Sequence, residues 1–192
     1  GSVACINGQW YIFYHRMTNG TIASRRGCVE KITILPNGTI PPVEMTSLGF
    51  EDSLNPYEIT PADIACVLKG GAFVTEKNVF DRVVTNIQDG SVIGYKYYDF
   101  GDDFGSMTME FSAKILGMGC DAVMHILIDG EDGEEIGCCR IGHDSSAIRT
   151  IVKSVTGRHA VFFKITTEYV GWMGEMFRGR NLFELCSFVF LK

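Results

Sequence analysis

The sequence has no long hydrophobic run, no basic cluster and no sustained helical pattern. Its apolar runs, such as Val161-Phe162-Phe163 and residues 10–14, are far shorter than the roughly 20 residues of a membrane-spanning helix. Lysine and arginine do not gather in one stretch, and the net charge of −6 offers no electrostatic footprint for nucleic acid. No segment repeats apolar residues at the spacing of a long amphipathic helix. These absences argue against a membrane segment, a nucleic-acid partner and long helices.

The sequence also lacks a dense cysteine framework. Its seven cysteines are an odd number spread through apolar segments, which predicts buried free thiols rather than a disulfide scaffold. Cys138 and Cys139 are adjacent on an expected strand and should point to opposite faces. A metal site that combines them with His143 is therefore disfavoured.

What is present is the composition of a globular β-protein. Hydrophobic residues make up 46% of the 192 positions and aromatic residues 11%, which is enough for one sizeable core and favours strands. Gly1-Ser2 resembles the remnant of a cleaved expression tag, so the natural N-terminus and the localisation are not readable from this sequence.

The first 47 residues predict a β-meander. Asn-Gly pairs, the strongest short hairpin signal, occur at residues 7–8, 19–20 and 37–38 between apolar or alternating segments. The expected strands are 3–6, 10–16, 21–26, 28–35 and 39–45. Residues 48–63 follow as a connector with two prolines and no sustained period.

Residues 64–192 predict an antiparallel β-sandwich of the jelly-roll type. Glycine and acidic turns separate short strands at regular spacing. In one of these strands Val161, Phe163 and Ile165 occupy alternate positions and should share a face of the strand, as core residues. The expected strands are 64–68, 72–75, 83–87, 91–100, 106–115, 122–128, 135–140, 147–154, 159–165 and 182–191. The fold class is thus all-β, a sandwich preceded by a meander.

Two sets of motifs resemble a known family. Three segments of the meander are similar to the last part of the five-bladed β-propeller of glycoside hydrolase family 43, the arabinofuranosidases and xylosidases that trim plant xylan. They are Asn7-Gly8-Gln9-Trp10-Tyr11-Ile12-Phe13-Tyr14-His15-Arg16, Arg25-Arg26-Gly27-Cys28-Val29-Glu30 and Val43-Glu44-Met45-Thr46-Ser47. Later segments, among them Asp89-Gly90-Ser91-Val92-Ile93-Gly94-Tyr95 and Gly157-Arg158-His159-Ala160-Val161-Phe162-Phe163, look like the sandwich that follows the propeller in some of these enzymes, which is similar to carbohydrate-binding module family 6.

The resemblance implies that the catalytic carboxylates lie on earlier propeller blades, outside this chain. Glu30 and Glu44 are the acidic residues of the quoted meander segments, and we expect both at a solvated face without a catalytic role. The chain alone should therefore show no glycosidase activity. The resemblance also implies secretion and partnership with plant cell-wall polysaccharide, namely xylan, arabinoxylan or β-glucan.

The resemblance further implies two metal features. His15 matches a histidine that helps to hold a metal ion in the central channel of an intact propeller, a site that this chain cannot complete alone. Similar sandwich modules often carry a structural calcium ion, but their early glutamates correspond here to Ile64 and Cys66, which are not hard oxygen ligands. Two acidic clusters remain as candidate ligands, although acidic turns are usually only solvated: Asp99/Asp102/Asp103 and Asp129/Glu131/Asp132/Glu134/Glu135.

The usual sugar contacts of the similar modules do not match this sequence. The two clamp aromatics correspond to Asn86 and to residues 143–148, which contain no aromatic, and the supporting asparagine corresponds to Glu184 or, with a gap, to Asn181. The strongest remaining candidate is the segment 168–180, expected as a loop. There Trp172 and Tyr169 would form a stacking platform, and the expected hydrogen-bond donors are Arg178, Arg180 and Asn181. Tyr97 is a candidate on the concave face, because Tyr97 and Tyr98 point to opposite sides of one strand.

Two hypotheses follow from these residues. In the first, the sandwich is a non-catalytic module that holds polysaccharide near an attached propeller. In the second, it binds no sugar and buttresses that propeller, with the loop aromatics as the docking patch. The edge of the meander also predicts self-association, since exposed strand edges pair readily.

Overall fold

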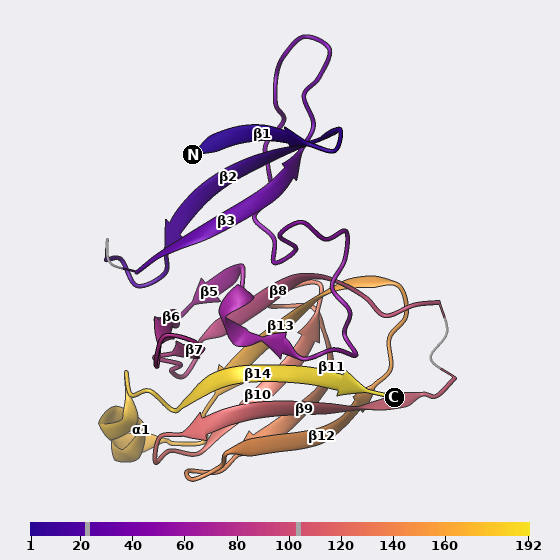
Figure 1. The fold of residues 1–192 in the computed structure, drawn as a ribbon. Coiled ribbons are helices and arrows are strands. Elements are labelled where there is room, and N and C mark those ends of the chain that lie inside the picture. The colour runs from indigo at the N-terminus through magenta and orange to yellow at the C-terminus, as the bar shows by residue number, and fades with distance from the viewer. Residues whose placement is uncertain (22–23, 103–104) are drawn as a thin grey trace.

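The structure is a computed structural model that describes residues 1–21, 24–102 and 105–192. It is almost entirely β-structure, which confirms the predicted fold class (Figure 1). A small three-stranded sheet, drawn in indigo and purple, lies above a sandwich of two antiparallel sheets. Residues 33–59 link the two parts. No described helix is long and apolar enough to cross a lipid bilayer.

The small sheet is an antiparallel meander of β1 (Ser2–Ile6), β2 (Gln9–Met17) and β3 (Arg25–Ile32). The β1–β2 turn is the predicted Asn-Gly pair, and both of its residues have the positive φ that a tight hairpin turn requires.

The expected strand 10–16 is confirmed by β2, but the strands expected after it are wrong. The expected strands 21–26 and 28–35 are replaced by the single strand β3, which runs unbroken through Gly27, while residues 22–23 lie outside the described residues. Residues 39–45 form no strand. The Asn37-Gly38 turn does form, closed by the N–H of Leu35 on the carbonyl of Thr39. We attribute the missing strand to Pro41-Pro42, which have no N–H to donate to a ladder.

The sandwich contains a strand for each of the ten that the sequence predicts in this region. One sheet has the order β11-β10-β13-β8-β5, and the other has the order β12-β9-β14-β7-β6 with the two-residue β4 beside β14. The bounds of these elements are β4 (Thr60–Pro61), β5 (Val67–Lys69), β6 (Phe73–Glu76), β7 (Arg82–Thr85), β8 (Val92–Asp99), β9 (Thr108–Gly117), β10 (Ala122–Ile128), β11 (Glu134–Ile141), β12 (Ala147–Lys153), β13 (Arg158–Thr166) and β14 (Phe183–Leu191). A short 3-10 helix, η2 (Ala62–Ile64), and a short α-helix, α1 (Gly171–Phe177), complete the fold.

An aromatic cluster between the two sheets forms the centre of the core. Phe188 on β14 is 2% exposed, and its ring lies 4.8 Å from that of Tyr95 and 4.9 Å from that of Phe163, centroid to centroid. Phe111 and Phe190 extend the cluster across the six-stranded sheet. These rings come from strands of both sheets, so their burial is what fixes one layer on the other.

The cysteines are free thiols, as expected, but not all of them are buried. Cys66, Cys120 and Cys139 are buried, whereas Cys5 and Cys138 are exposed. Cys138 and Cys139 do point to opposite faces of β11.

The central position of Phe188 predicts that two Phe→Ala substitutions differ strongly in their effect on the free energy of unfolding. Phe188→Ala should lower the free energy of unfolding by about 3–5 kcal/mol, because it removes a fully packed ring and leaves a cavity. Phe80→Ala is the matched control, since the Phe80 side chain is 92% exposed and its loss should change stability by less than about 0.5 kcal/mol. Urea unfolding followed by circular dichroism measures both, and equal effects of the two substitutions would contradict the assigned core.

Candidate functional site

The segment expected to carry a binding loop instead carries a helix. Residues 171–177 form α1, at one end of the sandwich and away from the small sheet (Figure 1). The loop expectation was wrong, because a seven-residue helix with glycines at its first and fourth positions gives no periodic signal. A hydrogen bond from the N–H of Gly174 to the carbonyl of Val170 closes its first turn.

Trp172 stands out from this helix into solvent. Its side chain is 73% exposed, and Val170 and Met176 are exposed beside it in the sequence. All three are apolar side chains that the described chain leaves largely uncovered. The indole is therefore available for contact with another molecule.

Tyr169 holds α1 on the sandwich. Its ring stacks on that of Phe177 at 4.2 Å between centroids and 16° between planes, and both rings pack against the main core. Its hydroxyl accepts the N–H of Asp121 at 2.7 Å. Tyr169 thus supports the helix that carries Trp172, and a role for it as a sugar platform stays a prediction.

The predicted hydrogen-bond donors near α1 already have protein partners. Arg178, the residue after α1, pairs with Glu175 of the helix. Arg180 donates to the carbonyl of Met176 and lies over the ring of Phe177. Asn181 accepts the N–H of Ile87 at 2.9 Å and donates to the hydroxyl of Thr85 at 3.1 Å. Contact of these three side chains with a ligand stays a prediction.

A cleft of about 360 Å³ opens between α1 and the β7–β8 turn. Several polar residues that line it are not among the site residues expected from the sequence: Gln88, Asp89, Thr167 and Glu175. Asp89 accepts the N–H of Thr167, which ties the turn to the segment before α1. The Asp89-Gly90 turn was visible in the sequence only as a turn signal. The cleft combines carboxylate and amide groups with the backbone of a glycine-rich helix, which suits recognition of hydroxyl groups.

Tyr97 lies on the outer side of β8, opposite the buried Tyr98, as the alternation predicts. It faces the linking segment, since its hydroxyl donates to Glu44 at 2.9 Å and Arg158 lies 4.3 Å over its ring. Farther along this outer face Phe162 is buried over Gly94, where a Cβ would approach the ring to 2.6 Å. A sugar contact by Tyr97 stays a prediction.

The described residues contain no group of three or more His, Cys, Asp or Glu side chains that could hold a metal ion. His15 is exposed on β2. The acidic residues around the β10–β11 turn do not converge, because each one faces its own cation or imidazole. The pairs are Asp129 with His159, Glu131 with Lys69, Asp132 with Lys164, Glu134 with Lys153 and Glu135 with His125. Asp103 of the other cluster lies outside the described residues. A structural calcium ion stays a prediction.

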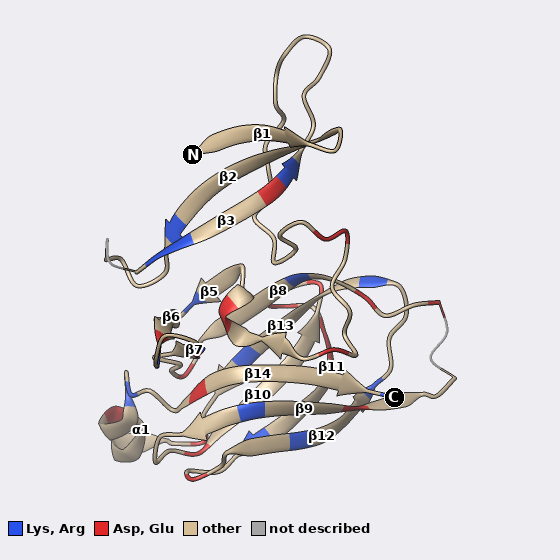
Figure 2. Cartoon of the chain, in the orientation of Figure 1, with Lys and Arg blue, Asp and Glu red and all other residues tan. Residues whose placement is uncertain are grey.

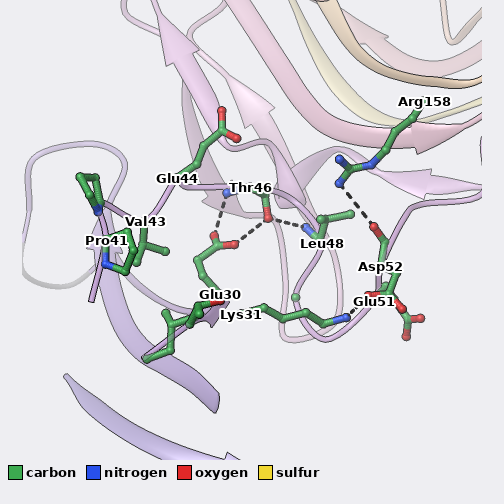
Figure 3. Close-up of a pocket in the computed structure, with 14 residues that line it drawn as sticks. Glu30, Lys31, Pro41, Val43, Glu44, Thr46, Leu48, Glu51, Asp52 and Arg158 are labelled. Atoms are coloured by element: carbon green, nitrogen blue, oxygen red, sulfur yellow. Dashed lines mark hydrogen bonds and ion pairs between the residues drawn. The ribbon is translucent and has the colours of Figure 1, made fainter. Parts of the chain in front are cut away.

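A second cleft, of about 360 Å³, lies where the small sheet meets the sandwich (Figure 3). Glu30 was expected at a solvated face, but it is only 5% exposed, which corrects that expectation. Its carboxylate accepts the N–H and the hydroxyl of Thr46, both at 2.7 Å, and the hydroxyl of Tyr14 at 3.2 Å. Burial, followed by the charge of Glu30, raises the pKa of Tyr14 above its ordinary value. Because both of its oxygens accept hydrogen bonds, Glu30 acts as a structural clip, by which we mean that it joins β3 to Thr46 of the linking segment.

The linking segment wraps around the β3 edge of the small sheet. Glu30 pairs with Ile12, so it lies on the face opposite Tyr11 and Phe13. The ring of Phe50 packs on that other face, 5.2 Å from Tyr11 and 6.1 Å from Phe13 between centroids. Residues 46–50 thus contact both faces of the small sheet.

The clip predicts a stability effect. Glu30→Ala should lower the free energy of unfolding by about 2–3 kcal/mol, because it leaves the N–H and hydroxyl of Thr46 without their acceptors. The exposed neighbour variant Glu51→Ala should change it by less than about 0.5 kcal/mol. Urea unfolding at neutral pH tests this, and an equally small effect of Glu30→Ala would show that the buried carboxylate does not stabilise the junction.

Glu44 predicts a pH dependence. The hydrogen bond from Lys96, at 2.8 Å, and then that from Tyr97 hold the pKa of Glu44 below its ordinary value against the opposing effect of desolvation. A lowered folded-state pKa stabilises the fold above the unfolded pKa, and this contribution is lost as the pH falls through the acid range. Because Glu44 is half exposed, the contribution is below about 1 kcal/mol.

Glu44→Gln should therefore flatten the fall in unfolding free energy between pH 7 and pH 4, measured by urea titration, while Glu51→Gln should leave it as in the parent. Parallel profiles for the parent and Glu44→Gln would refute the assignment.

The chain is similar to known proteins in both sequence and structure. No protein-family profile matches the chain. In sequence it is 43% identical over 121 residues to a xylosidase/arabinosidase of Thermoclostridium stercorarium, a match that covers 52% of this chain and 26% of that protein. In structure, 99% of the chain superposes on 40% of a glycoside hydrolase family 43 arabinoxylan arabinofuranohydrolase from Bacillus subtilis, with a TM-score of 0.66 and 24% identity.

The sandwich alone matches complete, separate modules. A family 6 carbohydrate-binding module from Clostridium cellulolyticum, solved in complex with xylose, is covered completely by 72% of this chain with a TM-score of 0.59 and 21% identity. The sandwich has the fold of a family 6 carbohydrate-binding module. A β-1,3-glucan binding module of that family from Bacillus halodurans gives the same TM-score at 16% identity.

This chain covers only part of the length of the enzymes that it matches. It spans about a quarter of the curated relative and 40% of the arabinofuranohydrolase, where it corresponds to the C-terminal region. In the described residues we find a module of family 6 fold with the small sheet clipped to it, and no assembled catalytic site.

Proposed function

We propose that this chain is a non-catalytic, carbohydrate-binding accessory module of a secreted glycoside hydrolase that degrades xylan or arabinoxylan. The sequence similarity to a xylosidase/arabinosidase and the family 6 fold support the proposal. The observation that carries it is the exposed indole of Trp172 on a helix anchored to the core. The catalytic propeller would be the covalently attached partner, and the chain alone releases no arabinose or xylose.

The proposed mechanism is stacking with polar recognition. The apolar C–H face of a pyranose ring packs on the indole of Trp172, which lies ready without a change in the helix. Gln88, Asp89 and Glu175 line the cleft between α1 and the β7–β8 turn, and they accept or donate hydrogen bonds with sugar hydroxyls. Trp172 is carried by the same helix but does not line that cleft. Binding at this end keeps the polymer near the attached enzyme and raises the effective substrate concentration there.

The alternative is a purely structural domain that buttresses the propeller and binds no sugar. It is favoured by the density of contacts at the junction, where Arg16 donates to two backbone carbonyls of the sandwich and Glu44 receives Lys96 and Tyr97. Such contacts fix the small sheet to the module. They do not account for Trp172, which lies at the other end of the sandwich.

Affinity electrophoresis on xylan, arabinoxylan and mixed-linkage β-glucan separates the two functions. We expect the parent chain to be retarded by at least one of these polymers, and Trp172→Ala to weaken binding about tenfold to a hundredfold, as truncation of a central aromatic contact usually does.

Trp10→Ala is the matched control, since it removes the other tryptophan of the chain, on the small sheet. It should leave the retardation unchanged. Absence of retardation by all three polymers would favour the structural alternative, and retardation that survives Trp172→Ala would place the binding surface elsewhere.

A further inference from the structure

A third cleft, of about 300 Å³, lies between the small sheet and the sandwich and is lined by arginines from both. Figure 2 shows basic residues, drawn in blue, at the ends of β2 and β3 that lie nearer the sandwich. The charged residues that line the cleft are Arg16, Arg25, Arg26, Arg82, Glu30 and Asp63. Four guanidinium groups thus face two carboxylates in a protein whose net charge is −6.

The nearby carboxylates balance these four arginines only in part. Arg82 is also paired with Glu76, with 3.5 Å between its Nε and a carboxylate oxygen. Glu30 uses its oxygens for Tyr14 and Thr46, as described above. Asp63 is shared, with its Oδ2 3.9 Å from a guanidinium nitrogen of Arg26 and 3.8 Å from one of Arg82. Both distances exceed a hydrogen bond. The cleft therefore keeps an excess of positive charge.

Two of the arginines have unusual surroundings. Arg16 donates to the backbone carbonyls of Cys66 at 2.8 Å and Ala65 at 3.0 Å and to the sulfur of Met45, all neutral acceptors. The Nε of Arg26 is buried and has no hydrogen-bond partner in the described structure, although the side chain is only 15% exposed. Burial, followed by the charge of Arg82, lowers the pKa of Arg26. A buried guanidinium with an unused donor, next to a second cation, is costly unless an anion joins it.

We propose that this arginine cleft binds the carboxylate of an acidic sugar, such as a uronic acid substituent of a plant polysaccharide. A carboxylate matches the guanidinium fork and can accept two parallel hydrogen bonds. The cleft volume suits a sugar ring better than a bare inorganic ion. That the carboxylate belongs to a sugar rests on the proposed carbohydrate function, whereas the site itself is separate from the α1 cleft.

Calorimetric titration of the full chain with sodium glucuronate, glucose and inorganic phosphate, at constant ionic strength, tests the proposal. The parent should bind glucuronate, and glucose should give no signal at this site. Arg26→Gln keeps the length of the side chain but removes its charge, and it should weaken glucuronate binding by about tenfold or more. The control Arg149→Gln removes an exposed arginine of β12 that pairs with Glu110 of β9 and does not line the cleft, and it should bind glucuronate like the parent.

The unfolding temperature measured in chloride, without glucuronate, shows whether a variant loses binding only because its fold is less stable. If the cations repel one another in the empty cleft, Arg26→Gln should unfold at the same or a higher temperature than the parent while it loses the rise that glucuronate produces. Should Arg26→Gln unfold at a lower temperature, Arg82→Gln provides the second variant and must show the weakened binding.

Three results would overturn the proposal: no binding of glucuronate by the parent, equal affinity for the parent and both cleft variants, or binding of phosphate without glucuronate. The last result would identify a site for inorganic anions. Failure of this site is distinguishable from failure of the proposed function, because Trp172→Ala should retain glucuronate binding and the cleft variants should retain retardation by neutral xylan.

Discussion

Burial of aromatic rings between the two sheets is the constraint on which the rest of the structure depends. Phe188, Tyr95 and Phe163 meet at the centre of the sandwich and lock strands of opposite layers together. Tyr169 and Phe177 pack against the edge of the same core and carry α1 with them. The position of Trp172 therefore follows from core packing, which is how a seven-residue helix can hold an indole in solvent without long-range helical structure.

The junction between the small sheet and the sandwich is stabilised by different interactions. It is held by polar groups that are buried and paired, above all Glu30 with Thr46, and by Arg16 on two backbone carbonyls. Such contacts add specificity of orientation, because each one requires a defined geometry and is expensive when broken. The arginine cleft lies in the same junction, where the charges are not balanced. The two regions explain why the module has one apolar and one charged candidate site.

The sequence was informative where the pattern is local. The alternation of Val161, Phe163 and Ile165 predicted β13, and similar periodicity predicted the other strands of the sandwich within a few residues. Three features escaped, α1 because its own sequence gives a weak helical signal and the other two because their causes are not local. Glycines at 171 and 174 hid α1, Glu30 is buried by Thr46 from sixteen residues away, and Arg26 meets Arg82 only through the fold. In the small sheet, Pro41-Pro42 outweighed the hairpin signal of the preceding turn.

The central claim is that Trp172 is the contact surface for a polysaccharide. It is tested most directly by tryptophan fluorescence of the Trp10→Phe variant, in which Trp172 is the sole indole of the chain. Titration with a xylo-oligosaccharide should change the intensity or the emission maximum in a saturable manner, because stacking of a sugar removes water from the indole. An emission spectrum that stays constant up to millimolar ligand, while the polymer still retards the same variant in a gel, would contradict the account.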